Sequence, residues 1–238
     1  MSPALSLIIP AYNESARLPP FLQTTRDYLA AVFGERYEVI VVDDGSADGM
    51  PGILAAAAGD WPQLSVLRHA QNQGKGAAVR TGMLAARGEL LLFADADGAT
   101  PIAEEARLRA AIEAGADLAV GSRLTAGAHV ATERHWLRGL LGRMFASLAR
   151  RCAGTSVRDT QCGFKMFRRE VGRTLFSRVQ ERGYLLDVEV LLWAERLGYR
   201  IAEVPVNWTE QADSRLNMRR DGWKMLYGLW RLRRRTAQ

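Results

Sequence analysis

Short apolar runs alternate with helical patterns from residue 4 to about residue 121, and this alternation limits the possible folds more than any other feature of the sequence. The run Val39-Ile40-Val41-Val42 is apolar at every position, as expected for a strand that is covered on both faces. Strands that alternate with helices indicate crossover connections and a parallel sheet. Strands are expected at residues 5–9, 39–42, 64–67, 90–93 and 118–120, and helices at residues 19–33, 50–58, 76–86 and 103–114.

After residue 121 the pattern changes. Residues 134–151 show apolar side chains at spacings of three and four, which predicts a long amphipathic helix. Between residues 215 and 235 the chain has eight basic residues and one acidic residue. Further strands are expected at residues 163–167 and 200–206, and further helices at residues 187–197 and 217–234. We therefore predict an α/β fold with a mostly parallel central sheet flanked by helices and a basic amphipathic C-terminal helical extension.

The 238 residues are predicted to form a single domain, because neither an internal repeat nor a linker interrupts them. The N-terminus lacks the pattern of a secretory signal, and no window of about 18 apolar residues predicts a membrane-spanning helix. The two cysteines suggest no disulfide framework and favour a reducing compartment. The formal net charge of +6 indicates an anionic partner, which could be nucleic acid, a membrane surface or a phosphorylated substrate.

Lysine is rare in this basic chain. Of the 32 basic residues only Lys75, Lys165 and Lys224 are lysines, which makes them candidates for sites that need a compact positive charge. Codon bias would leave the same pattern, so both explanations stay open. The histidines show no metal-ligand spacing and are expected to be incidental; they are His69, His129 and His135.

Polar segments follow three of the predicted strands: Pro10-Ala11-Tyr12-Asn13-Glu14, Asp43-Asp44-Gly45-Ser46 and Asp95-Ala96-Asp97-Gly98. In open α/β sheets, ligands bind beyond the carboxyl ends of the strands. Neither a dinucleotide fingerprint nor a P-loop is present, and Asn72-Gln73-Gly74-Lys75-Gly76 only hints at a phosphate loop. Carboxylates at strand ends without a P-loop suggest a nucleotide held through its base, its ribose and a metal ion.

Asp95 and Asp97 are two residues apart after an apolar strand, so both carboxylates can point into one cleft. Mg²⁺ is typically bound by one or two carboxylates together with substrate phosphates. An ordinary turn is the alternative, since aspartate and glycine favour turns. The aspartates at the neighbouring strand end favour the metal site.

This set of motifs resembles the family 2 glycosyltransferases, which have the GT-A nucleotide-sugar fold. The likeness spans roughly residues 4–212, and the blocks around Asp159 and Asn207 are similar to the branch that glucosylates dolichyl phosphate. The residues that support it are Asp43–Ser46, Asn72–Gly76 with Arg80, Asp95–Thr100, Gly121–Arg123, Arg158–Lys165, Asp187–Glu189 and Val206–Glu210.

The resemblance implies a metal-dependent, inverting transfer of glucose from UDP-glucose to a dolichyl or polyprenyl phosphate. It implies catalytic roles for Asp97 and Asp187, and Mg²⁺ or Mn²⁺ held by Asp97 and Asp95. The acceptor phosphate would meet Arg123, Arg138 and Gln161. The implied nucleotide-sugar contacts are Pro10, Ala11, Tyr12, Glu14, Asp44, Gly45, Lys75, Asp95 and Ala96. Residues 4–121 would then bind the nucleotide-sugar, residues 122–212 would form the acceptor side, and residues 213–238 would form the basic helix.

Ala99 departs from the related lipid-phosphate mannosyltransferases, which have a metal-binding glutamine at this position. Alanine cannot ligate a metal, so the third protein ligand is unassigned and the glucosyl branch is favoured. For Asp187, the alternative to a catalytic role is an N-cap of the helix at 187–197. A phosphate monoester is largely dianionic at neutral pH, so the implied acceptor needs no strong general base.

Other functions remain open at this stage. A polyprenyl-phosphate mannosyltransferase, or a transferase that uses a different nucleotide-sugar, would share most of these motifs. A nucleotidyltransferase also uses strand-end aspartates, but the segment Pro10–Glu14 does not match its glycine-rich signature. The basic C-terminus would suit a nucleic-acid-binding module, yet no nucleic-acid motif accompanies it and we expect no nucleic-acid partner. It suits an anionic membrane surface equally well, so we expect a peripheral protein at the cytoplasmic face of a membrane.

Overall fold

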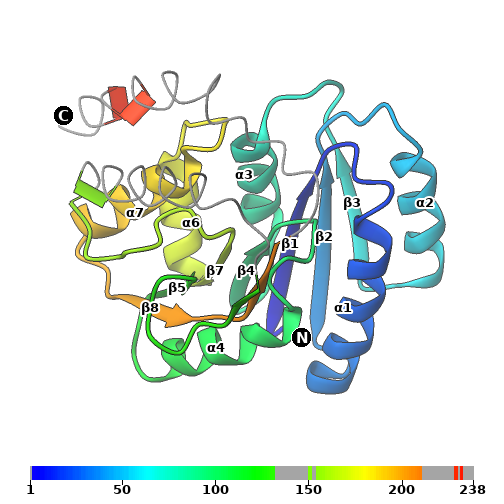
Figure 1. The fold of residues 1–238 in the computed structure, drawn as a ribbon. Helices are drawn as coiled ribbons and strands as arrows, with labels where there is room; N and C mark the ends of the chain where they lie inside the picture. The colour runs from blue at the N-terminus through cyan, green and yellow to red at the C-terminus, as the bar shows by residue number, and fades with distance from the viewer. Residues whose placement is uncertain (1, 132–149, 152–153, 211–227, 230, 233–238) are drawn as a thin grey trace.

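A computed structural model describes residues 2–131, 150–151, 154–210, 228–229 and 231–232. Its central sheet has seven strands in the order β3-β2-β1-β4-β7-β5-β8 (Figure 1). The strands are β1 (Leu5–Ala11), β2 (Tyr37–Asp43), β3 (Leu64–Arg68), β4 (Leu90–Ala94), β5 (Leu118–Ser122), β7 (Phe164–Arg168) and β8 (Ile201–Pro205). All seven expected strands are therefore present.

The sheet is parallel except for β7, which runs antiparallel to both β4 and β5. In this register Phe164, the first residue of β7, pairs with Ala94, the last residue of β4. The residues before β7 therefore lie at the same sheet edge as the residues after β4. The prediction of a mostly parallel sheet is confirmed, and the reversed strand brings the Asp159 block to the edge where we expect the site.

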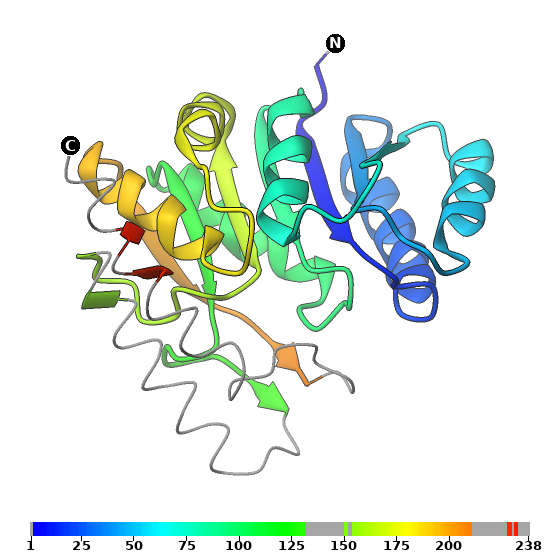
Figure 2. The same ribbon diagram turned by 90° about the horizontal axis from the view of Figure 1, so that it is seen from above.

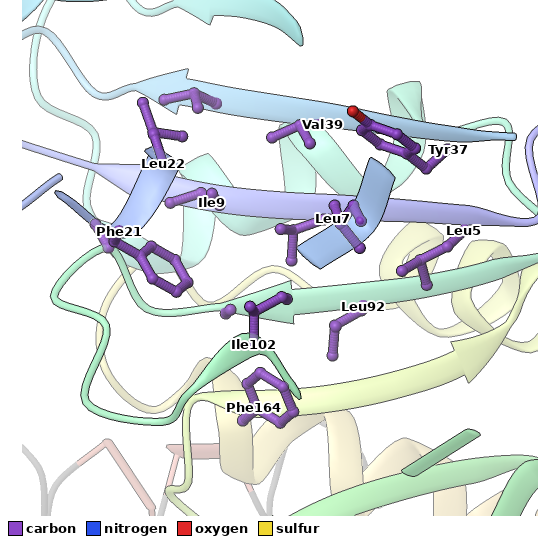
Figure 3. Close-up of a cluster of buried hydrophobic side chains, with 14 of the residues drawn as sticks. Leu5, Leu7, Ile9, Phe21, Leu22, Tyr37, Val39, Leu92, Ile102 and Phe164 are labelled. Atoms are coloured by element: carbon purple, nitrogen blue, oxygen red, sulfur yellow. The ribbon is translucent and has the colours of Figure 1, made fainter. Parts of the chain in front are cut away.

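Helices cover both faces of the sheet (Figure 1). Leu7 and Ile9 of β1 belong to one buried apolar cluster and Ile8 to the other, as the alternation of side chains along a strand requires. Figure 3 shows the first cluster, in which Phe21 and Leu22 lie against the strands. The helices are α1 (Leu18–Phe33), α2 (Met50–Asp60), α3 (Lys75–Ala85), α4 (Glu105–Glu113) with the 3-10 turn Ile102–Glu104 before it, α6 (Arg169–Arg178) and α7 (Leu186–Arg196).

Helix α6 and a second small sheet were not expected. The small sheet pairs β6 (Val130–Ala131) with β9 (Trp208–Thr209), and Figure 2 shows these two short strands side by side. Most of the predicted helix at 134–151 and most of the one at 217–234 lie outside the described residues. No helix in the described part of the chain is both long enough and apolar enough to cross a membrane.

Candidate active site

The segments that follow β1 and β2 are tied together by backbone and side-chain hydrogen bonds. Asn13, whose φ of 50° is positive, accepts the Ala47 N–H through its side-chain oxygen at 2.9 Å. Pro10 and Ala11 are buried at the end of β1, and Ala11 belongs to the first apolar cluster. Of the predicted nucleotide contacts in this segment, Tyr12 is exposed, and Glu14 is half-buried and paired with Arg17.

Asp44 is buried, and its carboxylate is the centre of a hydrogen-bond network. Its Oδ1 accepts the Gln73 N–H at 2.9 Å and lies 2.7 Å from Nδ1 of His69, while its Oδ2 accepts the Gly74 N–H at 2.8 Å. An ionised carboxylate has about four acceptor positions, so one remains for a ligand. The predicted contact between Asp44 and uracil stays a prediction, but the structure gives Asp44 a second task, which is to hold the loop at residues 72–76.

That loop is not free to cradle a phosphate. The Arg182 carbonyl accepts the Gly76 N–H at 2.7 Å and the Ala77 N–H at 3.3 Å. Together with the two N–H groups on Asp44, four backbone donors around the start of α3 already have partners. A Cβ at Gly74 would lie 2.3 Å from the Arg182 carbonyl oxygen, so the close contact requires glycine. The hint of a phosphate loop is therefore not supported.

Lys75 and two aspartates form the charged part of the site. The Lys75 ammonium lies 2.7 Å from Oδ1 of Asp95, and Asp97 accepts the Ala99 N–H at 3.0 Å. Burial lowers the pKa of Lys75, but Asp95, Asp187 and Asp97 outweigh that effect and raise it above its ordinary value. Burial and the charge of Asp95 both raise the pKa of Asp97. The two carboxylates are thus close enough to influence each other electrostatically, and their shared metal site stays a prediction.

Asp187 pairs with Lys165 inside the protein. The Lys165 side chain is fully buried, donates to the Asp187 carboxylate and to the Cys162 carbonyl, and lies over the ring of Phe93. Leu185 precedes the first residue of α7, and among the described residues no side chain caps this helix. The N-cap alternative for Asp187 is therefore wrong. Two of the three lysines belong to this one charged cluster, and Lys224 lies outside the described residues.

Arg123 is held by Asp159 at the acceptor side of the predicted site. The Nε and Nη2 atoms of Arg123 donate to Asp159 at 2.7 and 2.8 Å, and the guanidinium lies over the ring of Trp208. Burial raises the pKa of Asp159, but the Arg123 guanidinium and its hydrogen bonds lower it below its ordinary value. Gln161 is half-buried nearby in the chain, and Arg138 lies outside the described residues.

The sequence analysis did not assign two residues to the site that the structure places there. His69 was expected to be incidental, but it contacts Asp44, so that expectation is wrong for this histidine. Gly163 lies directly beneath Asp95, since a Cβ at Gly163 would be 2.1 Å from Oδ2 of Asp95. Neither signal is visible in a single sequence, because both contacts depend on how the strands are ordered in the sheet.

The described residues contain no group of three or more histidine, cysteine, aspartate or glutamate side chains that could hold a metal ion. Asp95 and Asp97 are a pair, and the buried Ala99 adds no ligand. Such a pair fits a divalent cation that completes its coordination with phosphate oxygens.

A family model described as glycosyl transferase family 2 matches residues 6–176. The chain belongs to this family. A dolichyl-phosphate beta-glucosyltransferase of Drosophila melanogaster is 39% identical, and the match covers 96% of this chain and 77% of the relative. The enzyme of that name in Saccharomyces cerevisiae is 34% identical, with 93% of this chain and 71% of the relative covered. A third relative of that name, from Trichomonas vaginalis, is 39% identical. The match with this chain spans 66% of the length of that relative.

Solved structures confirm the predicted GT-A fold. Glucosyl-3-phosphoglycerate synthase from Mycobacterium tuberculosis, in complex with UDP, has a TM-score of 0.69 at 23% identity. The match covers 97% of this chain and 80% of the synthase chain. Mannosyl-3-phosphoglycerate synthase from Rubrobacter xylanophilus has a TM-score of 0.70 at 19% identity, and the match covers 99% of this chain and 74% of that synthase. At these identities the likeness concerns the fold alone.

Proposed function

We propose that this family 2 glycosyltransferase moves glucose from UDP-glucose to a dolichyl or polyprenyl phosphate, with inversion at the anomeric carbon. The observation that carries the proposal is the 34–39% identity, over most of the chain, to relatives named dolichyl-phosphate beta-glucosyltransferase. The geometry agrees with it, because carboxylates suited to a nucleotide-sugar lie at the same sheet edge as Arg123 and Asp159.

A divalent cation, Mg²⁺ or Mn²⁺, would be held by Asp95 and Asp97. Burial, and after it the negative charge of Asp95, raise the pKa of Asp97, and a bound cation would offset both effects, which supports this assignment. The glucosyl-3-phosphoglycerate synthase from Mycobacterium tuberculosis, which has a similar fold, has been solved with UDP and Mn²⁺ or Mg²⁺, and this supports the same metal chemistry here. When bound, such a cation stabilises the charge that develops on the diphosphate leaving group.

The residues of the chain then have the tasks of binding and alignment. The acceptor phosphate is itself the nucleophile and is largely dianionic at neutral pH, so no strong base has to remove a proton. One of its oxygens bonds to C1 of glucose while the bond from C1 to UDP breaks, and UDP leaves with the electron pair. Arg123, with Nε and Nη2 engaged by Asp159, presents its remaining edge to the acceptor phosphate. Holding the two reactants in line contributes to rate, because it removes the entropic cost of bringing them together.

Asp187 has a different place in this mechanism from the one implied by resemblance. Its carboxylate is 3% exposed and paired with the Lys165 ammonium, so it serves as a fixed counter-charge near Lys75 and not as a base. The acceptor lipid resides in a bilayer, and we propose that the enzyme works as a peripheral protein at the cytoplasmic face of a membrane.

A radiochemical assay tests the proposed function. UDP-[¹⁴C]glucose is offered with detergent-dispersed polyprenyl phosphate, and transfer appears as label that moves into the organic phase. Omission of the lipid phosphate should leave the label in water, and Asp97→Asn should do the same with the lipid present. GDP-mannose offered at the same concentration is the matched donor control. Transfer from GDP-mannose but not from UDP-glucose would contradict the proposed donor.

A further inference from the structure

His69 joins three elements beside the proposed donor site. It directly follows β3, and its imidazole is nearly buried, with 10% of the side chain exposed. Its Nδ1 lies 2.7 Å from Oδ1 of Asp44, which follows β2, and its Nε2 lies 3.0 Å from the hydroxyl of Thr81 on α3. Both ring nitrogens are therefore engaged, and the ring is fixed from two sides.

The partners of the ring determine its tautomer. An ionised carboxylate can only accept hydrogen bonds, so Nδ1 carries the proton and donates it to Asp44. Nε2 lies within hydrogen-bond distance of the Thr81 hydroxyl, which can both donate and accept and therefore fixes the ring in either case. Thr81 in turn fixes the ring relative to α3, the helix whose first residue is Lys75.

Asp44 passes this constraint on to the loop before α3. The carboxylate that accepts from His69 also accepts the Gln73 N–H at 2.9 Å and the Gly74 N–H at 2.8 Å. Lys75 is the next residue, and its ammonium reaches Asp95 at 2.7 Å. The Arg182 carbonyl holds the other side of the same turn through the Gly76 N–H. The position of Lys75 thus depends on the orientation of the Asp44 carboxylate.

We propose that His69 is a positioning residue of the donor site: it orients Asp44, which holds the loop at residues 72–76 and so places Lys75 against Asp95. The proposal rests on the proposed function only in that the site binds a nucleotide-sugar. Without the Nδ1 donor, the carboxylate keeps its two backbone partners but loses its contact with a side chain that is itself held by α3.

Two isosteric substitutions separate positioning from general stability. In His69→Asn the side-chain amide nitrogen occupies the place of Nδ1, whereas in His69→Gln it lies nearer the place of Nε2. Both remove the ring, so both should lower the melting temperature by similar amounts. Amide hydrogen exchange at Gln73 and Gly74 should stay close to wild type in His69→Asn and accelerate about tenfold in His69→Gln. Equal exchange in the two variants would overturn the proposal.

A double-mutant cycle tests the connection to Lys75. His69→Leu should reduce the affinity for UDP with Mn²⁺ about tenfold in the wild-type background, and less than about twofold when Lys75→Met is already present. A histidine with a merely structural role would give the same loss in both backgrounds, and that result would refute the inference. Wild-type protein that transfers no glucose would refute the proposed function instead, while the exchange experiment would still decide the role of His69.

Discussion

At the scale of single residues, the proposed site is made of charges that already have partners within the chain. Lys75 pairs with Asp95, Lys165 with Asp187 and Arg123 with Asp159. Such pairs fix the side chains before a substrate arrives, so less ordering remains to be done on binding. Asp97 differs from these paired carboxylates, because its side chain accepts a hydrogen bond from a backbone N–H. Burial and the charge of Asp95 raise its pKa. We therefore expect Asp97 to be the most sensitive position for metal binding.

Asp97→Ala should abolish transfer and the metal-dependent part of UDP binding while leaving the fold intact. The half-buried side chain lies in the turn three residues after β4, and its removal relieves repulsion with Asp95 without opening the core. Transfer rate with and without EDTA, and circular dichroism of the variant, check these two statements. Full turnover in EDTA would show that no divalent cation takes part.

Asp44 should select the base of the donor. The uracil imide donates a hydrogen bond to the acceptor position that remains on its carboxylate, while cytosine presents an acceptor at the same place. Calorimetry should therefore rank UDP well above CDP and ADP. Equal affinities for the three nucleotides would leave Asp44 with its loop-holding role alone.

Gly163→Ala should impair catalysis in a protein that still folds. The added methyl group would lie 2.1 Å from the Asp95 carboxylate, which must swing away from Lys75 to make room. We expect kcat/KM to fall at least about tenfold, with a loss of about 1–3 kcal/mol in the free energy of unfolding. Gly52→Ala is the matched control, since a Cβ there meets nothing within 4 Å and stabilises a helix. A Gly163→Ala enzyme with normal kcat/KM would show that the exact position of Asp95 is unimportant.

At the scale of elements, sequence periodicity predicts the strands and most helices but not their order. The apolar run at residues 7–9 identifies β1 and the one at residues 39–42 identifies β2, and both strands are buried along their whole length. The direction of β7 is invisible to periodicity, since it is decided by non-local pairing with β4 and β5. This reversal places Gly163 against Asp95 and Asp159 against Arg123. These two contacts could therefore not be derived from the spacing of residues in the sequence.

Helix α6 was missed for a local reason. It includes Gly172, which lowers helix propensity, and its apolar stripe is short. A Cβ at Gly172 would lie 3.0 Å from the Leu91 side chain of β4, so the helix packs close to the sheet at this glycine. Tertiary packing thus favours this helix although it is short and contains a glycine.

The Lys165–Asp187 pair places two charges on a face of the sheet that is otherwise apolar. Its neighbours on that face include Phe93 and Val120, both fully buried. Lys165→Met should leave Asp187 as an unpaired buried charge and lower the free energy of unfolding by about 3–5 kcal/mol. The double variant Lys165→Met with Asp187→Leu should recover most of this stability yet stay inactive. The measurements are chemical denaturation of both variants and the activity assay. A double variant that is no more stable than Lys165→Met would show that the buried, unpaired charge of Asp187 is not the cause of the loss.

At the scale of the whole molecule, charge is the property that the fold leaves unexplained. The formal net charge is +6, while the described site balances its lysines and arginine with aspartates. The excess is concentrated after residue 214, where the sequence has eight basic residues between 215 and 235. An acceptor that is a lipid phosphate lies at a bilayer surface, which is itself anionic on its cytoplasmic side.

The full-length protein should bind anionic vesicles in a salt-sensitive manner. Each basic residue near such a surface contributes about 1 kcal/mol, so half of the eight would be enough to localise the enzyme. Flotation with vesicles containing phosphatidylserine at low salt is the measurement, with neutral phosphatidylcholine vesicles as the control. Truncation after Ser214, or replacement of Arg219, Arg220 and Lys224 by glutamine, should greatly weaken flotation, and raising the salt should do the same because exposed charges are screened. If the full-length protein stays at the bottom of the gradient at low salt, the basic segment does not bind membranes and the lipid acceptor must be reached by another surface.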